Sequence, residues 1–244
     1  MNMQNTAVLR IAFLFSIVCG LCWNFQTKAS ESSPGEINAS KILVLGDSIS
    51  AGYGMPLEKG WVNLLEIFLQ ENYPGWTTIN ASVSGETTSG GLARFPDLLD
   101  AHNPEIVIIE LGGNDGLRGH PISSMKENLS QIVALTKQYN ALPIIVEMQI
   151  PPNYGKRYTD LFTEAFGAVA QKSGAVLIPF FLEQMAITEG FMQDDGIHPT
   201  ADAQPIMLEG FLPFIRPLLG KRNDGVERDY LPFCTSCPNM TVTP

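Results

Sequence analysis

Residues 105–115 read EIVIIELGGND, and this stretch decides the fold class of the chain. Its first part, 105–111, is a nearly continuous run of β-branched and aliphatic side chains. Such a run is typical of a strand that is buried on both faces, as in parallel sheets covered by helices. The Gly-Gly-Asn-Asp that follows has the composition of a loop. The stretch therefore predicts a buried strand of an α/β fold with a loop at its carboxyl end.

Short apolar runs and amphipathic segments alternate on both sides of this strand, which predicts a parallel sheet. The expected strands are 41–45, 77–80, 105–111, 144–149 and 175–179. The expected helices are 60–71, 89–102, 123–139, 156–173 and 203–219. Pro213 is expected to kink or divide the last helix. Because carboxyl ends of parallel strands meet at one edge, loops 46–48, 81–85 and 112–115 are expected to lie together.

The first 29 residues have the pattern of a signal peptide rather than of a folded element. Arg10 precedes an apolar run that is too short and too interrupted to span a bilayer comfortably, and 27–29 offer small residues at positions −3 and −1 for cleavage. This segment predicts export, to the periplasm or outside the cell. It is also the only part expected to contact a membrane, and an uncleaved anchor is the alternative.

The rest of the chain divides into a polar leader at 30–40, a folded domain at 41–219 and a tail at 220–244. The 244 residues, 45% of them hydrophobic, suit one globular domain with a real core. In an oxidising compartment Cys234 and Cys237 of the tail favour a small local disulfide over a redox or metal site.

The charge of the chain excludes some classes of partner. The formal net charge is −10, whereas a nucleic-acid-binding protein needs a basic face. An acidic surface is not attracted to anionic lipid either. We therefore expect no nucleic-acid partner.

The chain has only three histidines, so a catalytic base can be sought by elimination. His102 ends an expected helix, where a cation caps the carbonyl groups, and His120 has no acid within three residues. His198 has Asp195 three residues before it, and one tight turn can place that carboxylate against Nδ1 and leave Nε2 free. An ordinary ion pair within the loop is the alternative.

Ser48 follows the first expected strand and is the candidate nucleophile. A serine hydroxyl needs an imidazole to take its proton and a carboxylate to orient that imidazole. Two other interpretations remain: Ser48 caps a helix, or the Gly-rich segment 46–54 cradles a phosphate. The segment lacks the lysine of a P-loop and the spaced glycines of a dinucleotide site.

Acyl transfer also needs hydrogen-bond donors for the oxyanion that develops on the substrate. The backbone N–H groups of Ser48 and Gly85 and the side-chain amide of Asn114 all belong to the expected strand-end loops. For Asn114 alone an Asx-turn is the alternative. The coincidence of nucleophile, base, carboxylate and donors indicates an acyl-transfer site.

These residues resemble the four blocks of the SGNH (GDSL) hydrolases, in the order of that family. The blocks here are Gly46-Asp47-Ser48-Ile49-Ser50, Gly85, Gly112-Gly113-Asn114-Asp115 and Asp195-Gly196-Ile197-His198-Pro199. Within the family, segments 80–88, 110–119, 151–158 and 192–199 are similar to the bacterial periplasmic thioesterase I/protease I/lysophospholipase L1 group.

The resemblance implies a fold and a set of roles. The fold is a flavodoxin-like three-layer α/β/α sandwich with a five-stranded parallel sheet. Ser48 is the nucleophile, His198 the base and Asp195 the carboxylate that orients it. Ser48, Gly85 and Asn114 form the oxyanion hole.

A further segment of the family, matched here by 116–121, moves over the bound acyl chain, so the resemblance implies that Leu117 and Pro121 line the acyl site. The implied activity is hydrolysis of small acyl esters and thioesters through an acyl-enzyme, without metal or cofactor and without a stable protein partner. A carbohydrate O-deacetylase with the same triad and a non-catalytic flavodoxin-like binding module are the alternatives.

Overall fold

The strand expected from residues 105–111 is the middle strand of a five-stranded sheet in a computed structural model of the chain. All neighbouring strands are parallel, and their order is β2-β1-β3-β4-β5. The strands are β1 (Ser40–Gly46), β2 (Trp76–Asn80), β3 (Ile106–Glu110), β4 (Leu142–Val146) and β5 (Val176–Ile178). Every residue of β3 is buried, as its continuous apolar sequence predicts.

The structure describes residues 39–180, 185 and 187–220. The expected signal peptide, nearly all of the expected leader and the tail with its expected disulfide lie outside these residues. Among the helices that are described, none is both long enough and apolar enough to cross a membrane.

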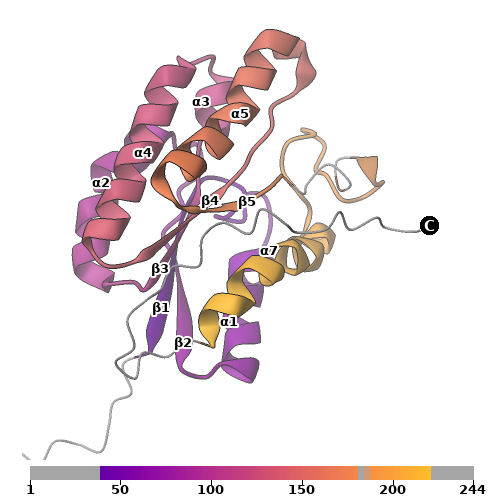
Figure 1. The fold of residues 1–244 in the computed structure, drawn as a ribbon. Helices are drawn as coiled ribbons and strands as arrows, with labels where there is room; N and C mark the ends of the chain where they lie inside the picture. Colours follow the sequence, from indigo (N-terminus) through magenta and orange to yellow (C-terminus); the bar gives the residue numbers. More distant parts are fainter. Residues whose placement is uncertain (1–38, 181–184, 186, 221–244) are drawn as a thin grey trace, which may run out of the picture. The chain divides into compact units, whose positions relative to one another are not determined.

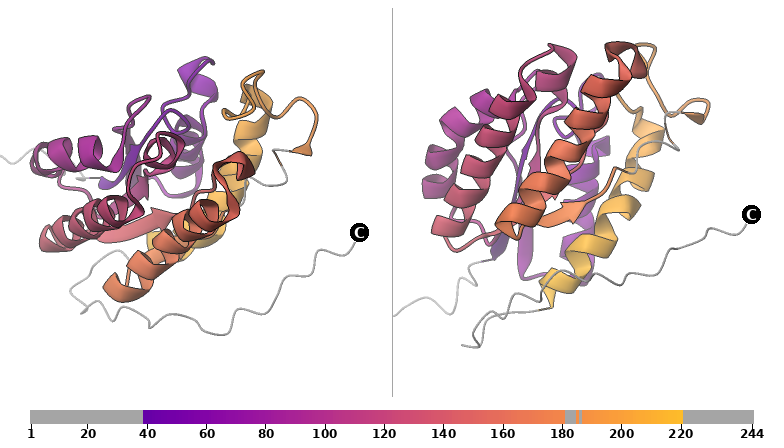
Figure 2. Two further views of the ribbon diagram at one scale, coloured as in Figure 1. Left: turned by 90° about the horizontal axis from the view of Figure 1, so that it is seen from above. Right: turned by 45° about the horizontal axis from the view of Figure 1, so that its top comes forward.

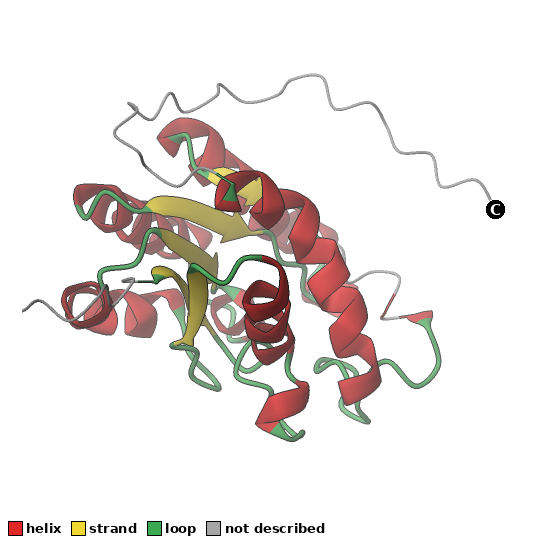
Figure 3. Cartoon of the chain, turned by 90° about the horizontal axis from the view of Figure 1, so that it is seen from below, coloured by secondary structure: helices red, strands yellow, loops and turns green. Residues whose placement is uncertain are grey.

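Helices cover both faces of the sheet and make three layers (Figures 1 and 2). The long helices are α1 (Trp61–Asn72), α2 (Thr88–His102), α4 (Ile122–Gln138), α5 (Lys156–Ser173) and α7 (Gln204–Leu219). Helices α2, α4 and α5 pack on one face, and α1 and α7 pack on the other. The view from below shows helices on both sides of the sheet (Figure 3). Short turns of helix lie between them: η1 (Leu57–Lys59), α3 (Gly113–Leu117), η2 (Pro152–Tyr154) and η3 (Ala201–Ala203).

The two layers of core follow from the alternation of side chains along the strands. Leu43 and Leu45 of β1 point to the face that carries α2, α4 and α5. Ile42 and Val44 point to the opposite face, against α1 and α7. All four are fully buried, so the sheet contributes apolar surface to both layers.

The expected helices agree with the observed ones to within one residue at each end, and four of the strands do too. The fourth strand is the exception, because it spans 142–146 and not 144–149. Pro143 was expected to lie outside the strand. It lies inside the strand for two reasons. The preceding residue, Leu142, donates its N–H to the carbonyl oxygen of Glu105, on the side of β3. On the opposite side, β5 pairs with β4 only from Ile144 onward. The backbone nitrogen of Pro143, which has no hydrogen to donate, therefore faces the side on which no neighbouring strand offers an acceptor at this position.

Pro213 does not divide the last helix, so of the two expected outcomes the division was wrong. Helix α7 runs without interruption and contains both Pro213 and Pro217. Both prolines are exposed, whereas Phe211, Leu212 and Ile215 are buried against the sheet. Water can therefore bind the carbonyl groups that the prolines leave unpaired, and packing of the apolar face holds the helix together.

Candidate active site

Ser48, His198 and Asp195 form one line of hydrogen bonds. The Nε2 atom of His198 lies 2.8 Å from Oγ of Ser48, and its Nδ1 atom lies 2.7 Å from Oδ2 of Asp195. The serine follows β1, and the other two residues belong to the loop before η3, 150 residues further along the chain. The Asp195–His198 pair is therefore more than an ion pair within its own loop.

The carboxylate of Asp195 is held by its own loop. Its Oδ1 atom accepts the backbone N–H groups of Ile197, at 2.9 Å, and of His198, at 3.0 Å. The hydrogen bond from the His198 backbone, helped by those from the His198 side chain and Ile197, lowers the pKa of Asp195 to about 2. The group is thus an anion at neutral pH, as the orientation of an imidazole requires.

Ser48 lies in a turn and does not cap a helix. Its carbonyl oxygen accepts the N–H of Tyr53 at 3.0 Å, and the next long helix, α1, begins only at Trp61 after Gly60 as its N-cap. Asp47 accepts the N–H of Ile49 at 3.0 Å and so closes the turn around the serine. The helix-cap interpretation of Ser48 is therefore wrong.

The three expected oxyanion donors border one cavity. Within the part of the chain that the structure describes, the N–H groups of Ser48 and Gly85 donate no hydrogen bond to another protein group. The side-chain amide of Asn114 donates to Oδ2 of Asp47 at 3.1 Å, across the site and not to its own backbone. One of its two N–H bonds remains for another acceptor.

The loop that carries Gly85 is held by hydrogen bonds with side chains of the segment after β3. Gly85 has φ +78°, a conformation that glycine adopts without steric cost, and its carbonyl oxygen accepts Nη2 of Arg118 at 2.9 Å. Just after it, both the backbone N–H and the hydroxyl of Thr88 donate to the buried carboxylate of Asp115, each at 2.8 Å. Asp115 thus ties the Gly85 loop to the segment that holds Asn114.

The cavity has a volume of about 430 Å³. Ser48, Gly85 and Asn114 form its polar corner, and the rest of its wall is mainly apolar. Leu117 borders it as expected, whereas Pro121 does not and instead precedes α4 as its N-cap residue. The wall also contains Met192 from the expected motif segment 192–199, and side chains that no motif indicated: Val146, Met148, Ile150, Phe180, Met207 and Phe211. They come from β4, from the segments after β4 and β5, and from α7, so only folding brings them together.

Two buried carboxyl groups lie beneath the nucleophile. Burial raises the pKa of Asp47 to about 6, against the opposing effects of the Ile49 N–H and of His198. Burial, together with the nearby charge of Asp47, also raises the pKa of Glu110 well above its ordinary value. A Cβ atom at Gly46 would lie 2.7 Å from Oε2 of Glu110, so glycine is needed for this close approach. The sequence indicated neither carboxyl as an unusual acid.

No group of three or more His, Cys, Asp or Glu side chains that could hold a metal ion occurs among residues 39–180, 185 and 187–220. The site itself contains a hydroxyl, an imidazole, carboxyls and N–H donors. Together they can transfer an acyl group to and from a serine.

Comparisons with known proteins agree with this chemistry. The model of the GDSL-like lipase/acylhydrolase family matches residues 44–204. An arylesterase of Vibrio mimicus is 46% identical over 196 residues, which cover 80% of this chain and 94% of that protein. The thioesterase 1/protease 1/lysophospholipase L1 of Escherichia coli K12 is 37% identical over 219 residues, which cover 90% and 98%.

Solved structures show the same likeness. The crystal structure of TesA is 45% identical, covers 73% of this chain and 99% of its own, and superposes with a TM-score of 0.71. The esterase AlinE4, described as an SGNH-hydrolase, is 36% identical, covers 77% and 99%, and gives a TM-score of 0.62.

The raised pKa of Asp47 predicts that the free energy of unfolding falls as the pH rises. Between pH 3.8 and about 6 the folded protein keeps a proton on Asp47 that the unfolded chain releases, so this stabilisation is lost as the pH rises. We expect Asp47→Asn, which cannot ionise, to gain roughly 2 kcal/mol of unfolding free energy relative to the wild type between pH 4 and pH 8. Urea unfolding of both proteins at the two pH values measures this. A difference between them that does not change with pH would contradict it.

Proposed function

The chain belongs to the GDSL-like lipase/acylhydrolase family and is an ester hydrolase, and we propose that it hydrolyses acyl esters and thioesters through an acyl-enzyme on Ser48. The observation that carries the proposal is the continuous line from Oγ of Ser48 through His198 to Asp195. This line ends at the polar corner of an apolar cavity, where an acyl group can meet the hydroxyl.

The first half of the reaction forms the acyl-enzyme. Nε2 of His198 takes the proton of Ser48 as Oγ bonds to the acyl carbon, and the ionised Asp195 stabilises the imidazolium. The carbonyl oxygen becomes negative and accepts hydrogen bonds from the N–H groups of Ser48 and Gly85 and from Asn114. The leaving alcohol or thiol then takes the proton from His198, and the ester or thioester bond breaks.

The second half releases the acid. Water gives a proton to His198 and its oxygen bonds to the acyl carbon, with the oxyanion in the same place. The proton then returns from His198 to Oγ of Ser48 as the acyl–enzyme bond breaks. The enzyme ends in its starting state, so the cycle needs no other reactant.

The apolar cavity supports an acyl chain rather than an acetyl group as the bound part of the substrate. Beyond the donors its wall consists largely of aliphatic, methionine and phenylalanine side chains, and 430 Å³ exceeds the space that two carbons need. Apolar chains gain from leaving water roughly in proportion to the area that they bury. We therefore favour acyl esters and thioesters over acetylated carbohydrates, and both over the non-catalytic binding module.

We also propose that the chain is exported, with 30–219 as leader and hydrolase domain after removal of 1–29. The sequence pattern of residues 1–29 supports this. The expected product of the full chain in a bacterial host is a periplasmic or secreted protein that begins at Ser30. Cell fractionation followed by N-terminal sequencing measures this. An intact N-terminus in the membrane fraction would favour the uncleaved anchor instead.

Removing the nucleophile tests the mechanism directly. We expect Ser48→Ala to lower the hydrolysis of p-nitrophenyl acyl esters and of acyl-CoA to near the uncatalysed rate, because the hydroxyl that bonds to His198 is lost. Ser124→Ala, on the exposed surface of α4, is the matched control and should retain full activity. Wild-type turnover by a folded Ser48→Ala protein would refute the acyl-enzyme.

The oxyanion hole is tested by Asn114→Ala. The loss of one donor to the developing negative charge should lower kcat by about 10²–10³-fold, with a smaller change in KM. Asn72→Ala removes an exposed amide at the end of α1 and should leave both constants unchanged. Steady-state kinetics on one ester suffices, and an Asn114→Ala enzyme with wild-type kcat would exclude this role.

A further inference from the structure

The loop that carries Asp195 and His198 closes on itself but is exposed at its tip. Met192 and Pro199 form an antiparallel bridge, and the N–H of Gln193 donates to the carbonyl of His198 at 2.8 Å. The side chain of Asp195, however, is 40% exposed. Residues 194–197 at the tip are all exposed, so contacts with other segments decide where His198 lies.

One side chain joins this loop to the loop of the nucleophile. Nε2 of Gln193 donates to the carbonyl oxygen of Tyr53 at 2.8 Å and to that of Pro199 at 3.1 Å. The N–H of Tyr53 in turn donates to the carbonyl oxygen of Ser48 at 3.0 Å. A path of three hydrogen bonds therefore links the backbone of Ser48 with the residue that follows His198.

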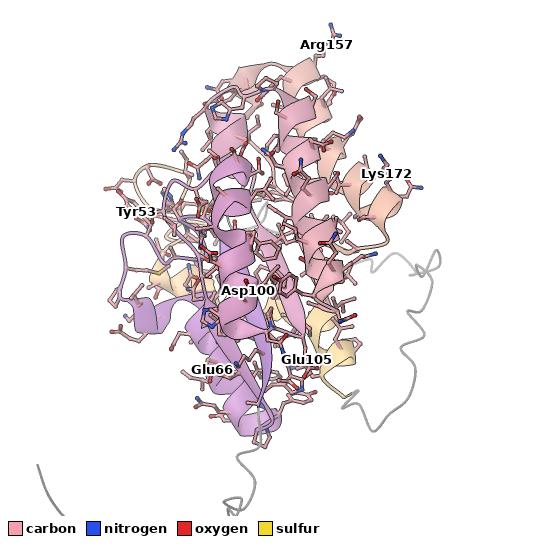
Figure 4. The ribbon with its side chains drawn as sticks, turned by 90° about the vertical axis from the view of Figure 1, so that its left-hand side faces the viewer. Tyr53, Glu66, Asp100, Glu105, Arg157 and Lys172 are labelled. Atoms are coloured by element: carbon pink, nitrogen blue, oxygen red, sulfur yellow. The ribbon has the colours of Figure 1, made fainter. Side chains whose placement is uncertain are left out.

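The nucleophile loop, residues 47–55 after β1, leaves room for the side chain of Gln193. Tyr53, labelled in Figure 4, stands on that loop, and its ring packs against the imidazole of His198 with centroids 4.6 Å apart. Gly54 has φ +75°, and a Cβ atom there would lie 2.4 Å from Oε1 of Gln193. Only a residue without a side chain leaves room for the amide at this place.

We propose that Gln193 is a positioning residue that sets the distance between His198 and Ser48, an inference that rests on the proposed function of these two residues. Both N–H bonds of its amide are used, one toward each loop, so the amide acts as a clasp between them. Gln193 does not touch the reacting atoms. Its effect on catalysis arises because small displacements of reacting groups cost large factors in rate.

The first experiment replaces Gln193 with methionine, which has a similar length and no donor. We expect Gln193→Met to lower kcat about 10–100-fold on a p-nitrophenyl ester, with KM changed less than about twofold. The control is Gln131→Met, whose amide only bonds to Glu127 on the exposed face of α4 and whose loss should change neither constant. A folded Gln193→Met enzyme with wild-type kcat overturns the proposal.

A second experiment makes the same substitution in the His198→Ala enzyme, and it separates positioning of His198 from a general structural role. If Gln193 acts by placing His198, Gln193→Met should change the residual rate of a His198→Ala enzyme less than about twofold, because the group that it positions is absent. An equal loss in both backgrounds overturns the proposal. An inactive Ser48→Ala together with a fully active Gln193→Met would refute only the clasp, whereas an active Ser48→Ala would refute the proposed function itself.

Two glycine variants test the clasp without changing Gln193, and so remain informative if Gln193→Met does not fold. Gly54→Ala places a methyl group against the amide, whereas Gly52→Ala, at a similar φ of +71°, has no atom closer than 3.7 Å. Both carry the same kind of backbone strain. We expect only Gly54→Ala to lose at least tenfold in kcat beyond the loss of its control. Equal kcat values for the two variants would overturn the proposal.

Discussion

The contact between Nε2 of His198 and Oγ of Ser48 is the constraint that the chemistry of the site places on the fold. It joins two loops that are 150 residues apart in the sequence. The parallel sheet meets this constraint because it delivers the carboxyl ends of its strands to one edge. The buried core on both faces makes that edge rigid, so a short hydrogen bond can be held between distant segments.

The carboxyl groups of the site have pKa values that are shifted in opposite directions. Asp195 is exposed and receives two backbone N–H groups, which keep it an anion beside the imidazole. Asp47 and Glu110 are buried beneath the nucleophile, and burial favours their neutral forms. Hydrogen bonding dominates the first case and desolvation the others. The anion of Asp195 thus lies where the imidazolium forms, whereas burial raises the pKa values of the two carboxyl groups near the nucleophile.

The polar corner and the apolar wall of the cavity come from different parts of the sheet. The loops after β1, β2 and β3 contribute the hydroxyl and the donors, and the segments after β4 and β5 contribute apolar side chains. A substrate with one reactive carbonyl and one apolar chain fits this division. With this division, an ester hydrolase can distinguish substrates by their apolar acyl chains while the reacting groups stay the same.

The sequence pattern was sufficient to predict the α/β class, the helices, four of the five strands and the small set of side chains that meet at the sheet edge. It could do so because periodicity is local and because His198 alone has a carboxylate three residues before it. Only the tertiary structure decided that Pro143 lies within β4, that α7 continues through Pro213, and that Met148, Phe180 and Phe211 form one wall. It also decided the pKa of Asp47 and the reach of Gln193 to Tyr53. These features depend on burial and on contacts between distant residues, and neither is encoded in any single stretch of the chain.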